Sequence, residues 1–178
     1  MPRLFTGLEI PADVAQRLSM LRGGLFGARW IEPEDYHVTL RFIGDIDGRT
    51  ADDIAHALGA VRRRPLTLEL SGLDVFGRDK PHSLHALVKP SRALEELAGE
   101  HERLMRRFGL APETRRFIPH VTIARLKGVD ARTMADWIAM RSPVSTGPFT
   151  VGRFALFSSK DSVGGGPYLV EETYPLVA

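Results

Sequence analysis

The chain has no cysteine among its 178 residues, and nowhere do about eighteen apolar residues follow one another. Without thiols, a disulfide framework, a thiolate metal site and a cysteine nucleophile are all excluded. Without a long apolar run, no membrane-spanning helix is predicted, and the N-terminus lacks the apolar segment of a signal peptide. We therefore expect a cytoplasmic protein that does not interact with a membrane.

The chain also has little excess of one charge, because 24 Lys and Arg residues are nearly balanced by 22 Asp and Glu residues and leave a net charge of +2. This balance excludes the charge density of a protein that coats DNA nonspecifically. The sequence pI of about 9.2 still favours an electropositive region. Such a region suits a small anionic substrate.

Hydrophobic residues make up 43% of the chain, enough for a sizeable core in one domain over residues 1–178. Hydrophobic periodicity and glycine or proline signals predict alternating strands and helices. We expect strands over 4–10, 36–43, 66–76, 83–88, 118–126, 149–157 and 168–176, and helices over about 11–25, 50–62, 91–108 and 131–140. A mobile hairpin loop is expected over 162–167.

Two copies of the pattern His-x-Thr-aliphatic stand 83 residues apart, at positions 37–40 and 120–123. Side chains alternate between faces in an extended strand, so His37 shares a face with Thr39, and His120 shares a face with Thr122. Two facing imidazoles can take and give a proton in one reaction, and two hydroxyls can donate hydrogen bonds to an oxyanion. This set suits the chemistry of a phosphodiester.

A second pair of landmarks has the same offset, because the tripeptides at 66–68 and 149–151 also stand 83 residues apart. The shared offset indicates a duplicated unit. We predict an α+β fold of two β-α-β-α-β units, over about 3–77 and 83–159, with a closing strand at 168–176. The units are expected to form two interlocked, pseudo-twofold lobes whose mostly antiparallel sheets face a central cleft.

A structural or metal-binding role for the histidines has less support. One motif alone is explained most simply by a structural histidine and a threonine that favours strands, but two copies at a shared offset disfavour coincidence. Neither motif has the nearby Cys, carboxylate or second His of a zinc or iron site, so no metal is expected. His56 and His101 lie in helical patterns and are expected to be structural, whereas His82 and His85 are expected at the surface or at a strand edge.

Further residues with a recognisable pattern surround both motifs and span nearly the whole chain. They are Arg3-Leu4-Phe5, Trp30, His37-Val38-Thr39-Leu40-Arg41-Phe42-Ile43-Gly44-Asp45, Phe76-Gly77, Pro119-His120-Val121-Thr122-Ile123-Ala124-Arg125, Leu156-Phe157-Ser158 and Tyr174-Pro175-Leu176. With them the chain resembles the 2H phosphoesterase superfamily, and within it the RNA 2′,3′-cyclic phosphodiesterases, also called LigT-type 2′-5′ RNA ligases.

This resemblance implies a bilobal α+β fold and an RNA partner with a 2′,3′-cyclic phosphate end or a 2′-5′ linkage. It implies opening of the cyclic phosphate to a 2′-phosphomonoester without a metal or other cofactor, and reversible 2′-5′ ligation of RNA fragments. In this pattern His37 is the proton donor to the leaving 3′ oxygen, and His120 is the proton acceptor that activates water. Thr39 and Thr122 hold the nonbridging phosphate oxygens, joined by Arg125. We expect a monomer.

Strict alternation conflicts with this pattern at Arg125, since it places Ala124 on the His120 face; a β-bulge or the strand end would reconcile them. Phe42 holds the matching position after His37, where its ring can stack on a nucleobase or pack in the core. Alternation places Arg41 on the His37 face, as a further candidate for phosphate binding, with an ordinary salt bridge as the alternative.

Two other functions stay open at this point. One is a module that holds nucleotides or RNA ends without turnover, and the other is a cyclic phosphodiesterase that acts on a small nucleotide. The intact pair of histidines disfavours the first, because binding without turnover needs neither imidazole. The residues that flank the cleft decide the second, and the sequence does not identify them.

Turnover of an oligonucleotide with a 2′,3′-cyclic phosphate end is expected to survive EDTA and to decrease with added salt. The predicted site attracts phosphate through arginine and hydroxyl donors, which a chelator leaves intact and salt screens. Initial rates with EDTA, with added divalent cations and across salt concentrations test this. Loss with the chelator and recovery with one divalent ion would contradict the predicted site.

Overall fold

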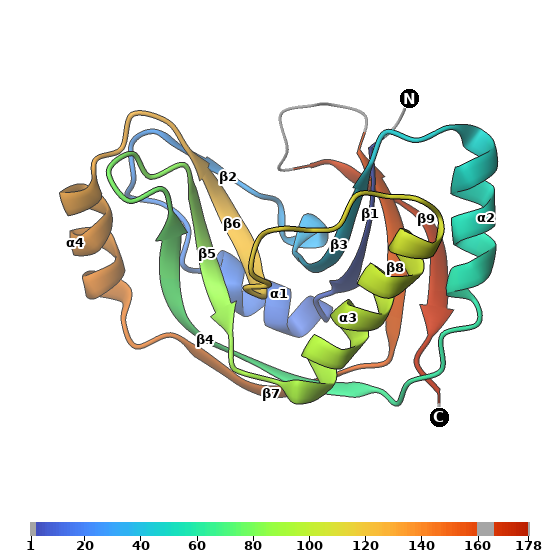
Figure 1. Cartoon of the computed structure of the whole chain (residues 1–178). Coiled ribbons are helices and arrows are strands. Elements are labelled where there is room, and N and C mark those ends of the chain that lie inside the picture. Colours follow the sequence, from blue (N-terminus) through green and yellow to red (C-terminus); the bar gives the residue numbers. More distant parts are fainter. Residues whose placement is uncertain (1–2, 160–165, 178) are drawn as a thin grey trace.

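A computed structural model describes residues 3–159 and 166–177 (Figure 1). In chain order the elements are β1 (Arg3–Glu9), α1 (Ala12–Ser19), β2 (Ala28–Trp30), the 3-10 turn η1 (Pro33–Asp35), β3 (His37–Gly44), α2 (Gly48–Leu58), β4 (Leu66–Phe76), β5 (Ser83–Val88), α3 (Arg92–Arg107), β6 (His120–Leu126), α4 (Ala131–Arg141), β7 (Ser145–Val151), β8 (Arg153–Ser159) and β9 (Tyr168–Pro175). The predicted α+β class is confirmed. Most of the hairpin loop expected over 162–167 lies outside the described residues.

Three details differ from the sequence prediction. The helix predicted over about 11–25 is shorter, since α1 ends at Ser19. The short elements β2 and η1, of three residues each, were not predicted, because three residues show no periodicity. The strand predicted over 149–157 is two strands, since β7 ends at Val151 and β8 begins at Arg153, with Gly152 between them.

All pairings between strands in the described residues are antiparallel, in the order β7-β4-β5-β6-β3-β1-β8-β9, with β2 added beside β6. We call β7, β4, β5 and β6 the β6 half, and β3, β1, β8 and β9 the β3 half. Figure 1 shows the first half on the left, with α4 outermost, and the second on the right, with α2 outermost. The prediction of separate sheets is replaced by one open sheet, whose halves meet where Val38 of β3 pairs with Val121 of β6.

The two repeats exchange their third strands. The second part of β4, from repeat 3–77, pairs with β5, whereas β8, from repeat 83–159, pairs with β1. The tripeptides that share the 83-residue offset pair with each other, so that Thr67 lies opposite Thr150. Each half of the sheet therefore contains strands from both repeats, and the repeats interlock through backbone hydrogen bonds.

A β-bulge interrupts the alternation of β3. Consecutive residues of β1, Gly7 and Thr6, pair with Thr39 and Arg41, so Leu40 is the extra residue. Leu40 and Arg41 are consequently both buried, and Phe42 returns to the face of His37 and Thr39 with 44% of its surface exposed.

A β-bulge also interrupts the alternation of β6. His85 and Leu84 of β5 pair with Thr122 and Ala124, which leaves Ile123 as the extra residue. Ile123 and Ala124 are both fully buried, and Arg125 returns to the face of Thr122. The bulge considered for Arg125 is therefore present, and β3 has its counterpart at the equivalent position.

Helix α3 shows how the helices cover this sheet. The Ser91 hydroxyl caps its N-terminus by accepting a hydrogen bond from the Leu94 backbone N–H, at 3.2 Å. Its buried face follows the helical period and packs into the main core with β3 and α2. The members of this face are Leu94, Leu97, Ala98, His101, Leu104 and Met105. Helix α3 belongs to the second repeat but packs against the β3 half.

Buried histidines make the fold sensitive to acid. His101 is fully buried, with its Nδ1 2.8 Å from the Thr6 hydroxyl, and burial lowers its pKa to about 3. Burial likewise lowers the pKa of His85 to about 4. Both residues remain neutral in the folded protein at pH values where they become charged in the unfolded chain.

The free energy of unfolding is expected to decrease as the pH falls from 6.5 toward 3. The pKa of His101 is lower in the folded protein than in the unfolded chain. The contribution of neutral His101 to the free energy of unfolding is therefore complete above pH 6.5 and is lost at lower pH, by about 1.4 kcal/mol per unit of pKa difference. Urea unfolding at several pH values measures this. His101→Gln should flatten the dependence, whereas His56→Gln, on the exposed face of α2, should not change it. An equal dependence in both variants would contradict the assignment to His101.

Candidate functional site

Six side chains from β3 and β6 lie on one face of the sheet, which we call the histidine face. They are His37, Thr39, Phe42, His120, Thr122 and Arg125. The antiparallel pair Val38 and Val121 lies between the histidines and threonines of the two strands. Extension of this register brings His37 toward Thr122 and Thr39 toward His120. The tertiary structure thus combines the two motifs into one constellation.

Both imidazoles are oriented by a backbone carbonyl two residues earlier. His37 Nδ1 lies 2.9 Å from the Asp35 carbonyl oxygen, and His120 Nδ1 lies 2.7 Å from the Ile118 carbonyl oxygen. A carbonyl only accepts hydrogen bonds, so each Nδ1 donates and carries the hydrogen. Each Nε2 is then the basic nitrogen of the neutral ring. In β3 this nitrogen lies 3.0 Å from the Thr39 hydroxyl.

Aromatic rings surround His37. The ring centroid of His37 lies 5.0 Å from that of Phe5, 5.6 Å from that of Phe157 and 4.9 Å from that of Tyr168. Gly7 permits this close packing, because a Cβ there would lie 2.8 Å from the Val38 carbonyl oxygen and 3.5 Å from His37 Cδ2. The imidazole therefore lies in a tight apolar environment.

The surroundings of His120 are different. The His120 ring lies 4.8 Å from that of His85 and 4.8 Å from that of Phe76, which contact each other at 4.3 Å. His85 is only 1% exposed, so the expectation of a surface residue was wrong. Its place on the central strand β5, opposite Thr122, explains this burial. Among the described residues, its Nδ1 has no hydrogen-bond partner.

The electrostatic environment favours neutral imidazoles in the substrate-free protein. Burial lowers the pKa of His37 to about 4, and the positive charges of His120 and Arg125 act in the same direction. Burial also lowers the pKa of His120, partly offset by the Ile118 carbonyl. Arg125 acts on both imidazoles, and its buried Nε has no hydrogen-bond partner in the described part of the chain. A buried donor without a partner is a suitable site for an anion.

Arg41 lies away from the histidine face. It is 8% exposed, and its Nε lies 2.5 Å from the Glu102 carboxylate of α3. The bulge at Leu40 explains this orientation, so the alternation argument for Arg41 was wrong. The geometry favours the salt bridge over the phosphate contact.

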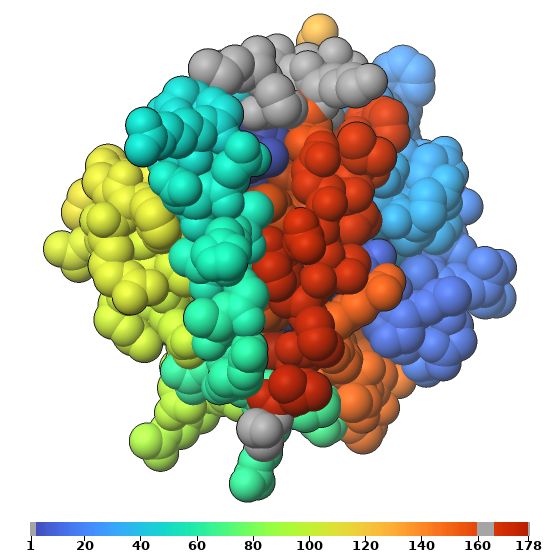
Figure 2. All heavy atoms as spheres, turned by 90° about the vertical axis from the view of Figure 1, so that its right-hand side faces the viewer, coloured from blue at the N-terminus to red at the C-terminus, as the bar shows by residue number. Residues whose placement is uncertain are grey.

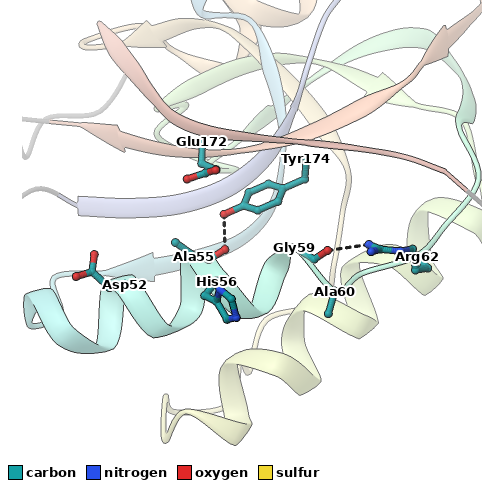
Figure 3. Close-up of a pocket in the computed structure, with 8 residues that line it drawn as sticks. All are labelled: Asp52, Ala55, His56, Gly59, Ala60, Arg62, Glu172 and Tyr174. Atoms are coloured by element: carbon teal, nitrogen blue, oxygen red, sulfur yellow. Dashed lines mark hydrogen bonds between the residues drawn. The ribbon is translucent and has the colours of Figure 1, made fainter.

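A separate pocket lies between α2 and β9, and none of its lining residues belongs to β3 or β6 (Figure 3). These two elements lie side by side in Figure 2. Two of its polar groups already form internal hydrogen bonds, since the Tyr174 hydroxyl donates to the Ala55 carbonyl at 2.7 Å and Arg62 donates to the Gly59 carbonyl at 2.7 Å. The pocket offers no convergent set of catalytic groups comparable to the histidine face.

Clustered metal ligands and long apolar helices are both absent from the described part of the chain. Within residues 3–159 and 166–177, no group of three or more His, Cys, Asp or Glu side chains could hold a metal ion. In the same ranges, no helix is long and apolar enough to cross a membrane.

The duplicated arrangement of the site matches a known family. The family model of LigT-like phosphoesterases matches residues 8–85 and 87–168, so each matched segment contains one histidine motif. The chain belongs to the LigT-like phosphoesterase family. The resemblance inferred from the sequence is therefore confirmed.

Relatives in the LigT-like family cover most of the chain. The RNA 2′,3′-cyclic phosphodiesterase of Aquifex aeolicus is 33% identical, over 91% of this chain and 89% of its own. The protein of the same name from Bacillus subtilis is 29% identical, over 88% of this chain and 87% of its own.

Solved structures agree on the fold. A protein of Thermus thermophilus matches with a TM-score of 0.78 and 25% identity, and covers 98% of this chain and 97% of its own. Escherichia coli LigT in complex with 3′-AMP matches with a TM-score of 0.74 and 21% identity over 100% of both chains. The α+β fold with its open sheet is thus the fold of LigT-like phosphoesterases.

Sequence reasoning missed part of the site. The carbonyls of Asp35 and Ile118 were not predicted, although their signal is present, since both lie two residues before a motif histidine. His85 carries no local signal, because only the pairing of β5 brings it near a motif. Phe5 and Phe157 belong to the pattern of the family, but their place beside His37 depends on the pairing of β1 with β3 and β8.

The pH profiles of kcat/KM and kcat are expected to differ. In the free protein the pKa of His37 is about 4 and that of His120 is also lowered, so kcat/KM should be highest below pH 6.5. A bound phosphate carries negative charge and raises the pKa of both imidazoles, so kcat should persist to higher pH. Rates with a cyclic phosphodiester from pH 4 to 9 test this. Superimposed basic limbs would contradict the expected effect of the phosphate.

Proposed function

We propose that this chain hydrolyses the 2′,3′-cyclic phosphate at RNA ends and leaves a 2′-phosphomonoester. The observation that carries the proposal is the pair of imidazoles on β3 and β6, each oriented through Nδ1, so that Nε2 is the nitrogen for proton transfer. In His37 this nitrogen lies beside the Thr39 hydroxyl, at 3.0 Å. The name shared by the Aquifex aeolicus and Bacillus subtilis relatives supports this substrate class. As proposed, the protein acts in the cytoplasm, as a monomer and without a cofactor.

The proposed reaction uses the two histidines in different roles. His120 Nε2 takes a proton from water, and the water oxygen attacks the phosphorus atom in line with the 3′ oxygen. The bond between phosphorus and the 3′ oxygen breaks, and His37 Nε2–H gives its proton to that oxygen. The product is a 2′-phosphate with a free 3′ hydroxyl. Exchange of one proton each with solvent restores both histidines.

Charge on the phosphate is stabilised by groups of the histidine face. The Thr39 and Thr122 hydroxyls and the Arg125 guanidinium are the proposed donors to the nonbridging oxygens. The bulge in β6 supports the role of Arg125, because it turns this side chain to the face of His120 and Thr122. The matching bulge in β3 presents the half-exposed ring of Phe42, the proposed stacking surface for a nucleobase.

His37 acts as an acid only when the substrate is bound. Its pKa of about 4 keeps it neutral in the free protein near pH 7. A phosphate bound between the imidazoles favours the protonated ring, because opposite charges attract strongly at a partly buried site. In this scheme the substrate itself brings the donor into its active protonation state. The same step with an RNA 5′ hydroxyl in place of water accounts for 2′-5′ ligation, because the 5′ oxygen bonds to phosphorus, the bond to the 3′ oxygen breaks, and the 2′-bound phosphate becomes a 2′-5′ linkage.

Hydrolysis of an oligonucleotide with a 2′,3′-cyclic phosphate end is expected to give the 2′-phosphate product. The oxygen that leaves must lie beside the proton donor, so assignment of this role to His37 fixes the 3′ oxygen as leaving group. Phosphorus NMR, or digestion by an enzyme that removes only 3′-phosphates, identifies the product. A predominant 3′-phosphate would reverse the roles of the two histidines.

The variants His37→Ala and His120→Ala test the proposed roles of the two histidines. Each should reduce kcat by about 10² or more, because each removes one obligatory proton transfer. Circular dichroism checks that the fold is intact. His56→Ala, in the separate pocket on α2, is the control and should retain full activity. Binding of the oligonucleotide without turnover by the unaltered protein would favour the noncatalytic module, and turnover of mononucleotides alone would favour the small-nucleotide enzyme.

A further inference from the structure

Arg41 forms a network away from the histidine face. The bulge at Leu40 turns its guanidinium toward α3, where Nε donates to the Glu102 carboxylate at 2.5 Å. Nη2 donates to the Ala111 carbonyl at 2.7 Å, and Nη1 donates to the Phe42 carbonyl. Three nitrogens of one buried side chain thus join strand β3, helix α3 and the segment that follows α3.

Glu102 extends the network into the same segment. Its second carboxylate oxygen accepts a hydrogen bond from the Glu113 backbone N–H at 3.1 Å. We call residues 109–119, between α3 and β6, the strap. The strap has no helix or strand of its own, and most of its residues are exposed. In its first part Leu110 packs against the main core, and the hydrogen bonds of Arg41 and Glu102 hold the exposed residues Ala111 and Glu113 that follow.

The far end of the strap reaches His120. The Ile118 carbonyl accepts the hydrogen bond from His120 Nδ1 at 2.7 Å. This carbonyl fixes which nitrogen carries the hydrogen and how the ring is oriented. The strap thus connects the Arg41 network on β3 with the orientation of the imidazole on β6.

We propose that Arg41 is a positioning residue, which anchors the strap through Glu102, Ala111 and Glu113 and thereby holds the Ile118 carbonyl against His120. The role rests on the proposed function of His120, but the anchoring itself is independent of any substrate. The bulge in β3 then has two effects at once. It presents Phe42 to the histidine face and sends the neighbouring Arg41 to the strap.

Release of the strap affects the protonation of His120. The Ile118 carbonyl raises the pKa of His120, so loss of this contact lowers it. Arg125 of β6 also acts on the pKa of His120, and the other titratable groups that interact with this ring are His37 of β3 and His85 of β5. None of them belongs to the strap, so their effects remain when the strap is released.

The first test compares Arg41→Met with Arg63→Met. Arg63 forms a similar ion pair with Glu100 of the same helix, also at 2.5 Å, but its ion pairs in the described residues are with α3 and not with the strap. We expect Arg41→Met to reduce kcat by about 10- to 100-fold with a smaller change in KM, because a small displacement of a catalytic group is costly. In the pH–rate profile of Arg41→Met, the limb that reports the titration of His120 should move to lower pH. Arg63→Met should change neither, and equal kcat values in the two variants would overturn the proposal.

A second test reads the strap directly with trypsin. Arg115 and Arg116 are exposed in the strap, and Arg78, exposed in the turn between β4 and β5, provides an internal reference. Mass spectrometry should show faster cleavage after Arg115 and Arg116 in Arg41→Met, with an unchanged rate after Arg78. This readout separates the two proposals. If the unaltered protein shows no phosphodiesterase activity, the proposed function fails while cleavage still tests the anchoring. Unchanged cleavage in the strap would overturn the anchoring.

A double variant separates positioning from stability. Arg41→Met leaves the Glu102 charge without its partner, which destabilises a partly buried site, whereas Arg41→Met with Glu102→Leu removes both charges. The double variant should recover thermal stability but keep the reduced kcat and the rapid cleavage of the strap. It also serves as the test if the single variant does not fold. Recovery of kcat together with stability would overturn the proposal, since an unpaired charge would then explain the whole effect.

Discussion

The site depends on one junction in the sheet, the antiparallel pair of Val38 and Val121. These valines are fully buried and lie between the histidine and threonine of each motif, so their pairing fixes the register in which the two motifs meet. A shift of one residue would turn one set of polar side chains into the core. The exchange of third strands between the repeats supports this junction, because it ties the two halves together at a distance from the histidines.

The two motifs are alike, but their neighbours are not. Gly7 of β1 pairs with Thr39, and His85 of β5 pairs with Thr122 at the corresponding position. Glycine allows aromatic rings to pack tightly around His37, whereas on the other side a third imidazole fills the space beside His120. A duplicated motif in a pseudo-twofold frame therefore acquires two different environments. Such a difference is what an acid and a base with separate roles require.

The bulges show where periodic reasoning fails. Alternation places Arg41 and Ala124 on the histidine face, but one extra residue in each strand reverses every side chain beyond it. For Arg125, the pattern of the family and the structure both place the side chain on the histidine face, contrary to simple alternation. For Arg41 the same shift moves a candidate phosphate ligand into an ion pair with α3. A bulge depends on the pairing between strands, so a single strand's sequence does not reveal it.

The sequence by itself determined the α+β class, most element boundaries, the two copies of the His-x-Thr motif and the chemistry that we propose for them, since these follow from local periodicity and from repeated residues. The tertiary structure alone decided the strand exchange, the burial of His85, the destination of Arg41 and the carbonyls that orient both imidazoles. These features arise from pairing between residues far apart in the chain. Their energies depend on burial and on hydrogen-bond geometry, which are set only when the two repeats interlock.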